Sequence, residues 1–381
     1  MTRIIQFGTS RFLQAHVDLF VHQARLQGQK VGPITVVKTT SGADRTRRIA
    51  ALKSGAPFPV RIRGLQVGRV IDQTVEVGSV DQALDAASEW PEVVRCFAHE
   101  AETAVSNVGD RGYELADQDT KFDDSATVAP RSFPAKLMVL LLARYRAGGK
   151  PLLFLPTELV SGNGSRLSRI IANLAVESGQ DDAFQSWLAE NVVFADTLVD
   201  RIVSEAIEPV GAVAEPYALW AIRKGRFAMP FRHPDVHLVD DLETTERLKL
   251  HILNLGHTVL ADLWLRQGRP ADETVRAMLA DLDIRSLLTT LYDQEVVPGF
   301  GRRSLGIEAA RYVAATFERF MNPFLDHRLA DIAQNHPAKL VNRVQAFLEW
   351  VRQRDAGFAA PRLAAILDQG SDDRTQQRLA R

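Results

Sequence analysis

Apolar side chains near the start of the chain change their spacing from one segment to the next. A short apolar run, RIIQF (residues 3–7), ends at Gly8, and residues 9–28 then carry apolar side chains at helical intervals. A second apolar run, PITVVKT (33–39), follows at once. This order predicts strand, tight turn, helix and strand, which is a βαβ unit of the length that a parallel crossover needs.

Further strand patterns recur over roughly the first 210 residues, with helical stretches between them. They lie at residues 59–77, 102–107, 150–159 and 191–203. The alternation predicts an α/β fold with a Rossmann-like, doubly wound sheet. From about Asp240 onward nearly every segment has helical periodicity. We therefore expect a dinucleotide-binding Rossmann-like domain over residues 1–212 and a mainly α-helical substrate and catalytic domain over 213–381.

Composition excludes several classes of protein. Hydrophobic residues make up 46% and charged residues 24% of the chain, as in soluble globular proteins, and the formal net charge of −1 gives no footprint for nucleic acid. No apolar run approaches bilayer length, and the start of the chain lacks the apolar core of an export signal. A single cysteine, Cys96, fits a reducing compartment. These features predict a cytoplasmic protein that acts on a small molecule, and they leave its oligomeric state open.

The first turn, FGTSRFLQAH, is a candidate dinucleotide site. Gly8 ends the strand, the amides of the following helical turn could face a phosphate, and Thr9 and Ser10 add hydroxyl donors. The usual Gly-x-Gly-x-x-Gly pattern has Ser10 at its second glycine and Leu13 at its third. An ordinary strand–helix turn with Ser10 as the N-cap is the alternative.

The end of the second predicted strand should distinguish NAD from NADP. An acidic residue there binds the ribose 2′-hydroxyl of NAD, but VVKTTSGADRTRRI has no acid before Asp44. The hydroxyl groups that could serve the ribose belong to Thr39, Thr40 and Ser41, and the cations that could hold a 2′-phosphate are Arg45, Arg47 and Arg48. These residues alone leave the preference open; we expect NAD as the cofactor, with NADP possible.

The segment KLHILNLGH sets Lys249, Asn254 and His257 among leucine and isoleucine. On an α-helix, which turns by about 100° per residue, Asn254 lies roughly 140° and His257 roughly 80° around the axis from Lys249, so all three fall on one side. The surrounding apolar residues predict a largely buried helix. Burial favours a neutral amine, which a general base needs, and the other two side chains could hydrogen-bond a developing oxyanion. A lysine that reaches the surface beside a satisfied core histidine is the alternative. Gly256 suggests that another group approaches the helix closely.

Lysine, four residues, asparagine, two residues and histidine resembles the signature of the polyol-specific long-chain dehydrogenases and reductases, the mannitol dehydrogenase family. Other segments resemble the same family in the same order over about residues 3–340. They are FGTSRFLQAH, SNVGDRGY, SFPAKL, LPTELVSGNG, TLVDRIV, EPYALW and RFMNP. Among the branches, the chain is most similar to the tagaturonate reductases (altronate oxidoreductases). It has Leu159 where mannitol and fructuronate enzymes usually carry an asparagine that contacts the oxyanion.

The resemblance implies an NAD(P)-dependent oxidoreductase that interconverts a secondary alcohol and a ketone of a sugar acid without a metal. Lys249 is the implied general base, Asn254 and His257 contact the reacting oxygen, and Glu246 could relay the proton to water. The implied substrate-binding residues are Asn163, Asp200, Arg201, Arg319, Asn322 and Lys136. The implied cofactor-binding residues are Gly8, Thr9, Ser10, Arg11, Phe12, Thr39, Ser106 and Asn107.

Three other accounts remain open. The same chemistry could act on a neutral polyol or ketose, or on a different sugar acid. A non-catalytic dinucleotide-binding regulator would keep the first turn but would have no use for an amine in an apolar helix. A zinc alcohol dehydrogenase is disfavoured, because Pro234 disrupts the helix that would align His233 with His237 and Cys96 stands alone.

Overall fold

The computed structural model describes residues 2–40, 43–109, 111–116, 119 and 127–368. They form two compact units. Unit 1 contains Met1–Ile62 and Asp72–Leu242, and unit 2 contains Arg63–Ile71 and Glu243–Arg381. No helix in the described part of the chain combines the length and the apolar character that crossing a membrane requires.

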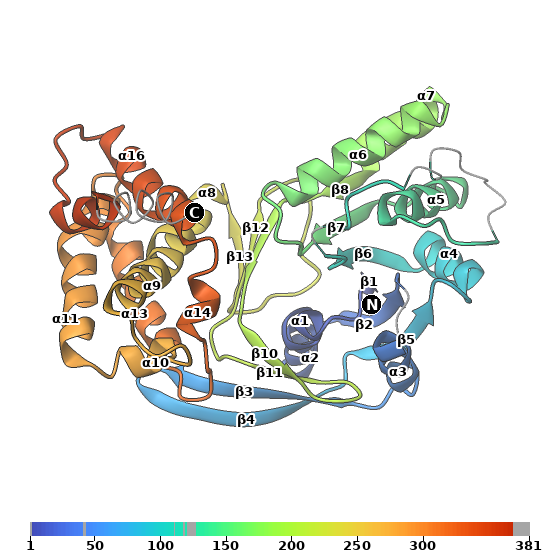
Figure 1. Ribbon diagram of the computed structural model, residues 1–381. Coiled ribbons are helices and arrows are strands. Elements are labelled where there is room, and N and C mark those ends of the chain that lie inside the picture. Colours follow the sequence, from blue (N-terminus) through green and yellow to red (C-terminus); the bar gives the residue numbers. More distant parts are fainter. Residues whose placement is uncertain (1, 41–42, 110, 117–118, 120–126, 369–381) are drawn as a thin grey trace, which may run out of the picture. The chain divides into compact units, whose positions relative to one another are not determined.

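The main sheet of unit 1 has six strands that pair in parallel (Figure 1). In chain order they are β1 (Thr2–Phe7), β2 (Val31–Lys38), β5 (Val80–Asp85), β6 (Ala101–Ser106), β7 (Leu152–Pro156) and β8 (Val192–Phe194). Their spatial order, β5-β2-β1-β6-β7-β8, is the 3-2-1-4-5-6 order of the Rossmann fold. The predicted fold class is therefore confirmed, and the strand order reverses between β1 and β6, where such sheets bind ligands.

Helices follow each of these strands except the last. They are α1 (Arg11–Leu13), the π-helix η1 (Gln14–Asp18), α2 (Leu19–Leu26), α3 (Ala43–Leu52), α4 (Trp90–His99), α5 (Phe133–Arg146), α6 (Asn163–Glu177) and α7 (Asp182–Asn191). Side chains of α4, α5, α6 and α7 form one core cluster with Ile5 and Phe7 of β1. Because β1 is central and its apolar side chains are buried, the carboxyl end of this strand is held rigidly.

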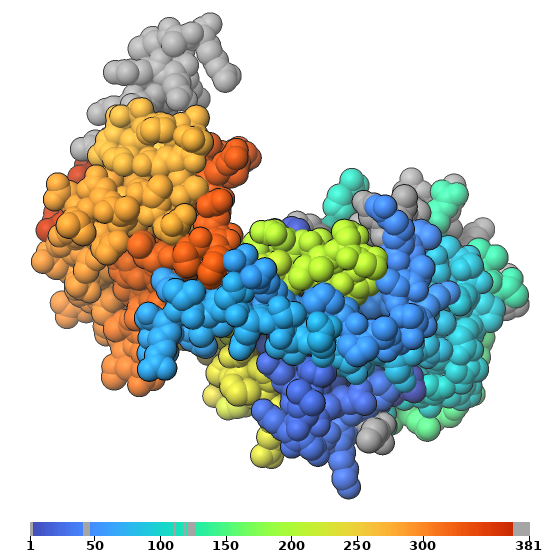
Figure 2. Space-filling view, turned by 90° about the horizontal axis from the view of Figure 1, so that it is seen from below, coloured from blue at the N-terminus to red at the C-terminus, as the bar shows by residue number. Residues whose placement is uncertain are grey.

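Two smaller sheets complete unit 1. One has the order β10-β11-β3-β4 and is built from β3 (Phe58–Gln66), β4 (Arg69–Val77), β10 (Val203–Ala206) and β11 (Ala212–Ala214). In Figure 2 the long β3–β4 hairpin is the blue band, with the yellow-green β10–β11 segment beside it. The other sheet has the order β13-β12-β9 and is built from β9 (Thr197–Asp200), β12 (Leu219–Arg223) and β13 (Val236–Val239). Since β12 pairs with β9, unit 1 extends to Leu242, beyond the boundary at residue 212 that periodicity predicts.

Unit 2 is helical around a single apolar core. Its elements are α8 (Glu243–Leu248), η2 (Lys249–Asn254), α9 (Leu255–Gln267), α10 (Val275–Met278), α11 (Leu282–Leu291), η3 (Tyr292–Val296), α12 (Val297–Gly301), α13 (Gly306–Phe320), α14 (Leu329–Ile332), α15 (His336–Lys339), η4 (Leu340–Gln345) and α16 (Ala346–Arg352). The tip of the β3–β4 hairpin also belongs here. The Gly68 amide donates to Glu318 Oε1 at 2.8 Å, and the Asn322 side chain donates to the Arg63 carbonyl at 3.3 Å.

Candidate active site

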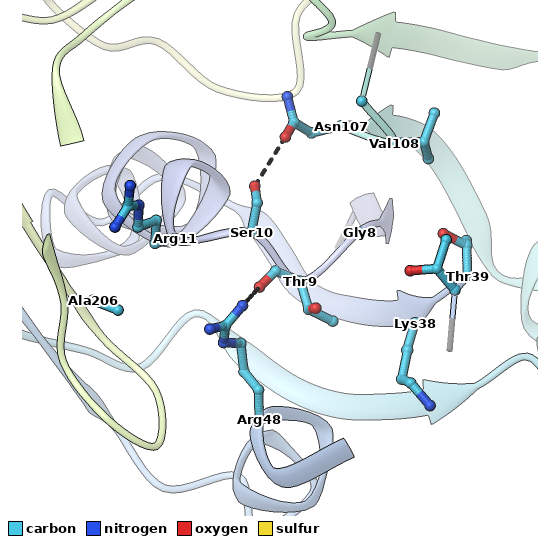
Figure 3. A pocket seen from close by; sticks show the side chains of 12 residues that line it. Gly8, Thr9, Ser10, Arg11, Lys38, Thr39, Arg48, Asn107, Val108 and Ala206 are labelled. Atoms are coloured by element: carbon cyan, nitrogen blue, oxygen red, sulfur yellow. Dashed lines mark hydrogen bonds between the residues drawn. The ribbon is translucent and has the colours of Figure 1, made fainter. Parts of the chain in front are cut away.

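A cavity of about 400 Å³ opens at the carboxyl ends of β1, β2 and β6. The amide of Gly8 donates to the Val37 carbonyl and the amide of Asn107 donates to the Phe7 carbonyl, both at 2.9 Å, so three chain segments meet there. Residues lining the cavity are Gly8, Thr9, Ser10, Arg11, Lys38, Thr39, Thr40, Arg48, Asn107, Val108, Gly109 and Ala206 (Figure 3). This is the switch point at which a Rossmann sheet holds a dinucleotide.

Gly8 is required by the close approach of two backbones. Its φ is +122°, and a Cβ atom at this position would lie 2.7 Å from the carbonyl oxygen of Asn107. Ser10 follows in extended conformation; its hydroxyl accepts from the Leu13 amide at 3.3 Å and donates to Asn107 Oδ1 at 3.0 Å (Figure 3). Ser10 is therefore an N-cap, as the alternative interpretation expects, and it also lines the cavity, while its contact with a dinucleotide stays a prediction. A turn of this shape fits a dinucleotide phosphate.

Six of the eight residues implied for the cofactor line this cavity, and two do not. The ring of Phe12 stacks on His16, with centroids 4.7 Å apart. Ser106 is buried, and its hydroxyl donates to Glu158 Oε2 at 3.1 Å. Phe12 and Ser106 therefore pack inside the protein instead of lining the cavity. Four residues that were not predicted do line it: Lys38, Val108, Gly109 and Ala206.

At the end of β2 a lysine occupies the place of the usual acid. Lys38 Nζ lies 2.6 Å from Asp85 Oδ2, and the Lys38 side chain is almost fully buried by this ion pair. Arg48 also lines the cavity and donates to the Thr9 carbonyl at 3.0 Å. Ser41 and the side chain of Arg45 lie outside the described residues. The cavity therefore offers hydroxyls and cations together, as the sequence indicates.

Glu158 organises the polar network behind the cavity. Its carboxylate accepts from the Ser106 hydroxyl, from the Val108 amide at 2.9 Å and from the Tyr113 hydroxyl at 3.1 Å. Burial raises the pKa of the Glu158 carboxyl. Leu159, at the position of the family's asparagine, is 73% exposed and contributes no hydrogen-bonding side chain.

Four residues implied for the substrate lie in unit 1, and main-chain carbonyls of that unit accept hydrogen bonds from three of them. Asn163 Nδ2 donates to the carbonyls of Glu158 and Thr197, and Arg201 donates to those of Ala15 and Glu215. Lys136 Nζ donates to the Arg131 carbonyl at 2.6 Å, and burial lowers the pKa of Lys136 to about 8. The fourth, Asp200, is buried at the end of β9. None of the four lines the cavity described above.

The segment with Lys249, Asn254 and His257 lies in unit 2 and is not a continuous α-helix. Residues Lys249–Asn254 wind as a π-helix, and the amide of Leu255 donates to the carbonyl of Leu250, five residues earlier. This corrects the helical projection, which assumed α-helical winding at every residue. Because a π turn holds more residues than an α-helical turn, Asn254 is rotated away from Lys249 by less than α-helical winding would give. His257 follows three residues later on α9, where i and i+3 share a face.

Burial differs among these three side chains. Lys249 and Asn254 are half-buried, whereas His257 is only 7% exposed. The expected burial of Lys249 is therefore partial, since residues 244–250 lie at the partly exposed beginning of the helix. The ring of His257 packs on Phe320, with centroids 4.5 Å apart.

Basic side chains act on His257. Burial, and then the charges of His327, Arg319, Arg343 and Lys339, lower its pKa well below the ordinary value, so the imidazole is neutral at pH 7. Arg319 lies on α13 and is 5% exposed, Lys339 ends α15, and Arg343 lies in η4. Sequence reasoning named Arg319 alone; the other three are 70 or more residues from His257 along the chain, and no spacing signal connects them.

The zinc alternative finds no support in these side chains. His233 Nε2 lies 2.8 Å from Gln23 Oε1, and its ring stacks on Phe20. Among the described residues, no three histidine, cysteine or acidic side chains are arranged to hold a metal ion.

A Rossmann sheet with a glycine turn at its switch point, followed by a helical unit that presents lysine, asparagine and a neutral histidine, defines a dinucleotide-dependent oxidoreductase. The family model of the mannitol dehydrogenase Rossmann domain matches residues 2–232, and that of the mannitol dehydrogenase C-terminal domain matches residues 241–367. The chain therefore belongs to the mannitol dehydrogenase family. This membership confirms the expected class, an NAD-dependent dehydrogenase or reductase that acts on a CH–OH group.

Several curated relatives carry the name altronate oxidoreductase. The altronate oxidoreductase of Halalkalibacterium halodurans is 28% identical over 92% of this chain and 71% of its own length. That of Klebsiella pneumoniae is 29% identical over 96% of this chain and 78% of its own length. That of Bacillus subtilis is 25% identical over 90% of this chain and 73% of its own length. The resemblance to this branch that the motifs indicate is thus confirmed.

Solved structures share the fold. A D-sorbitol dehydrogenase in substrate-free form matches with a TM-score of 0.73 and 18% identity, over 92% of this chain and 76% of that one. Pseudomonas fluorescens mannitol 2-dehydrogenase, in a ternary complex with NAD and D-mannitol, matches with a TM-score of 0.67 and 17% identity, over 97% of this chain and 79% of that one. At this identity they support the fold alone.

Proposed function

We propose that the protein interconverts D-altronate and D-tagaturonate with NAD, by oxidising a secondary hydroxyl of the sugar acid. The observation that carries the proposal is the set of basic side chains, Arg319, Lys339 and Arg343, whose charges act on His257 in the unit that also holds Lys249; Arg343 Nη1 donates to the Asn254 carbonyl at 3.2 Å. A sugar acid brings one negative charge, and a buried negative charge is stable only when it is paired. The names of the relatives agree with this substrate class.

Each residue of the signature has a role that its chemistry permits. Lys249 takes the proton of the substrate hydroxyl as general base. Asn254 donates its side-chain amide to the reacting oxygen, and the neutral imidazole of His257 does so through a ring N–H. NAD supplies the acceptor for the hydride. The cavity at Gly8 would hold it, because the missing Cβ and the backbone amides of the turn leave room for a diphosphate.

The carboxylate of the substrate is assigned to the cations of unit 2. The guanidinium of Arg319 can form two parallel hydrogen bonds with a carboxylate, which fixes its orientation as well as its charge. Lys339 and Arg343 add charge from a second helical segment, α15 and η4. Asn322, which follows Arg319 after one turn, holds the hairpin tip through the Arg63 carbonyl.

Steady-state kinetics on four substrates test the proposal. D-altronate, D-mannonate, D-mannitol and D-sorbitol are each assayed with NAD⁺ and with NADP⁺. We expect the highest kcat/KM for D-altronate with NAD⁺. Higher kcat/KM for a neutral polyol would contradict the sugar-acid assignment and leave the class of enzyme intact.

Lys249→Ala separates an enzyme from a regulator. Turnover should fall by about 10³-fold or more, as for loss of a general base, while NAD binding measured by calorimetry stays within twofold. Lys224→Ala is the control, since Lys224 is an exposed lysine paired with Asp240 in unit 1. Undiminished turnover of Lys249→Ala would overturn the assigned role of this lysine.

A further inference from the structure

The spacing of the signature fits the winding of its helix. Five residues separate Lys249 from Asn254, and three separate Asn254 from His257. In an uninterrupted α-helix the first interval rotates the side chains by about 140°, so Lys249 and Asn254 would lie at the two edges of one side of the helix. In the structure that interval is one π turn, whose wider winding brings residue i+5 closer to the direction of residue i, and the second is an α-helical interval. The π turn therefore narrows the face that carries the three side chains.

A π turn is an uncommon conformation and needs support from its surroundings. One carbonyl inside it, that of Ile252, accepts a hydrogen bond from the hydroxyl of Tyr292 at 2.8 Å. Tyr292 is fully buried in the core of unit 2 and begins another π-helix, η3, which packs against η2. A buried hydroxyl aimed at a main-chain oxygen of the π turn is a specific contact, since either group would lose a partner without the other.

Gly256 makes this contact possible. A Cβ atom on Gly256 would lie 1.9 Å from the Tyr292 hydroxyl oxygen and 3.1 Å from Phe320 Cε2. The absent side chain therefore leaves the space through which the tyrosine reaches Ile252. Arg343 supports the end of the turn from another side, because its Nη1 donates to the Asn254 carbonyl at 3.2 Å.

We propose that Tyr292 is a positioning residue: its hydroxyl, admitted by Gly256, holds residues 249–254 in the π turn that aligns Lys249 with Asn254 and His257. Without the hydroxyl the turn relaxes toward α-helical winding, and Lys249 rotates away from the other two by about 100°, the angle of one residue. This inference rests on the proposed role of Lys249 as the base.

Tyr292→Phe removes one oxygen atom and keeps the ring in the core. With D-altronate and NAD⁺ we expect kcat to fall by at least about tenfold, because misplacement of a catalytic group costs rate rather than affinity. KM for NAD⁺ should stay within twofold, and the acid limb of the kcat/KM pH profile should move. Ile284→Val is the matched control, because it removes one methylene from the same core without touching a main-chain carbonyl. It should lower the melting temperature and leave the pH profile in place.

The double variant Gly256→Ala/Tyr292→Phe separates the hydrogen bond from packing. The added methyl group takes the place of the hydroxyl but lies 3.1 Å from both the ring carbon Cζ of residue 292 and Phe320 Cε2, so we expect the double variant to fold with a melting temperature close to that of Tyr292→Phe. It should still have low kcat, because no group donates to Ile252 in place of the tyrosine. Recovery of wild-type kcat in the double variant would show that packing alone matters and would overturn the proposal.

Lys249→Ala is measured in parallel, so that the two proposals fail separately. If Lys249→Ala is inactive and Tyr292→Phe has wild-type kcat and pH profile, the positioning role is wrong while the base stands. If Lys249→Ala keeps its turnover, the assignment of the base is wrong, and the positioning role falls with it.

Discussion

Lys38 and Asp85 form an ion pair at the carboxyl ends of β2 and β5, with Nζ and Oδ2 2.6 Å apart. Lys38 also lines the cavity at Gly8, at the strand end where NAD enzymes usually carry an acid. Burial raises the pKa of the Asp85 carboxyl, but hydrogen bonds from Lys38 and the Ala87 amide outweigh it and hold the pKa below its ordinary value. Asp85 therefore neutralises a cation that lines the cavity.

Asp85→Asn should shift the cofactor preference toward NADP. The freed charge of Lys38, beside Arg48, favours a 2′-phosphate, so the ratio of kcat/KM for NADP⁺ to that for NAD⁺ should rise by about tenfold, or ~1.4 kcal/mol. Asp81→Asn, also on β5 but paired with Arg3, is the control and should leave the ratio unchanged. An unaltered ratio in Asp85→Asn would mean that Lys38 does not reach the cofactor.

Gly8→Ala should abolish NAD binding. The methyl group would lie 2.7 Å from the Asn107 carbonyl oxygen, so β1 and β6 would have to separate at the switch point. Gly28→Ala is a matched control, because Gly28 also has positive φ, +79°, yet a Cβ there has no neighbour within 4 Å. It should cost only the backbone strain, about 1–2 kcal/mol. Calorimetric titration with NAD⁺ and thermal melting measure both effects; equal NAD⁺ affinities in the two variants would contradict the steric account.

Lys339→Gln tests the cations around His257. Loss of one positive charge should raise KM for D-altronate by roughly five- to tenfold, about 1 kcal/mol, as for a charge-assisted contact. KM for NAD⁺ should not change, and KM for D-mannitol, a neutral polyol, should change by less than twofold. A parallel rise for both substrates would indicate a disturbed fold instead of a lost charge.

Asp18 gives the protein a pH-dependent stability. Burial raises the pKa of its carboxyl to about 8 from an ordinary 3.8, so the folded chain keeps a proton that the unfolded chain releases between these values. The protonated Asp18 carboxyl contributes its full stability below pH 3.8, and this contribution is lost as the pH rises through about 8. Asp18→Asn, neutral at every pH, should therefore gain melting temperature relative to the wild type between about pH 4 and pH 8.

The control for Asp18 is an exposed acid. Asp326→Asn removes a carboxylate that is 80% exposed, and its melting temperature should follow that of the wild type across the same pH range. If Asp18→Asn also runs parallel to the wild type, the Asp18 carboxyl is ionised in the folded protein.

Local patterns predicted much of the fold. The apolar run ending at Gly8 became β1, and the alternation of strands and helices gave the parallel sheet, because these signals depend on neighbours along the chain. The end of unit 1 was missed by thirty residues, from 212 to Leu242. Pairing of β12 with β9 decides that boundary, and short strands of this kind leave little periodicity.

The candidate site was predicted in part, for related reasons. The motif FGTSRFLQAH marked the cavity, but it could not show that Phe12 stacks on His16 while Lys38 lines the cavity. The segment TLVDRIV likewise could not show that the Arg201 guanidinium donates hydrogen bonds to main-chain carbonyls. The π turn at Lys249 is a tertiary effect, since the partner of Ile252 lies 40 residues away. Contacts between residues that are far apart in the chain give no signal in the spacing of residue types along the sequence.

The β3–β4 hairpin has a consequence for how this enzyme could have been assembled from parts. Residues Arg63–Ile71 lie in the helical unit, where Arg63 covers the ring of Phe324 at 4.0 Å and holds Asn322, although the strands that carry them root in the nucleotide-binding unit. A carboxyl-terminal fragment that begins after Leu242 would lack residues 63–71 and their contacts with Asn322 and Phe324. To exchange the helical unit between members of the family, two separate coding segments therefore have to be transferred. One encodes residues 243–381, and the other encodes residues 63–71, which lie within the sequence of unit 1.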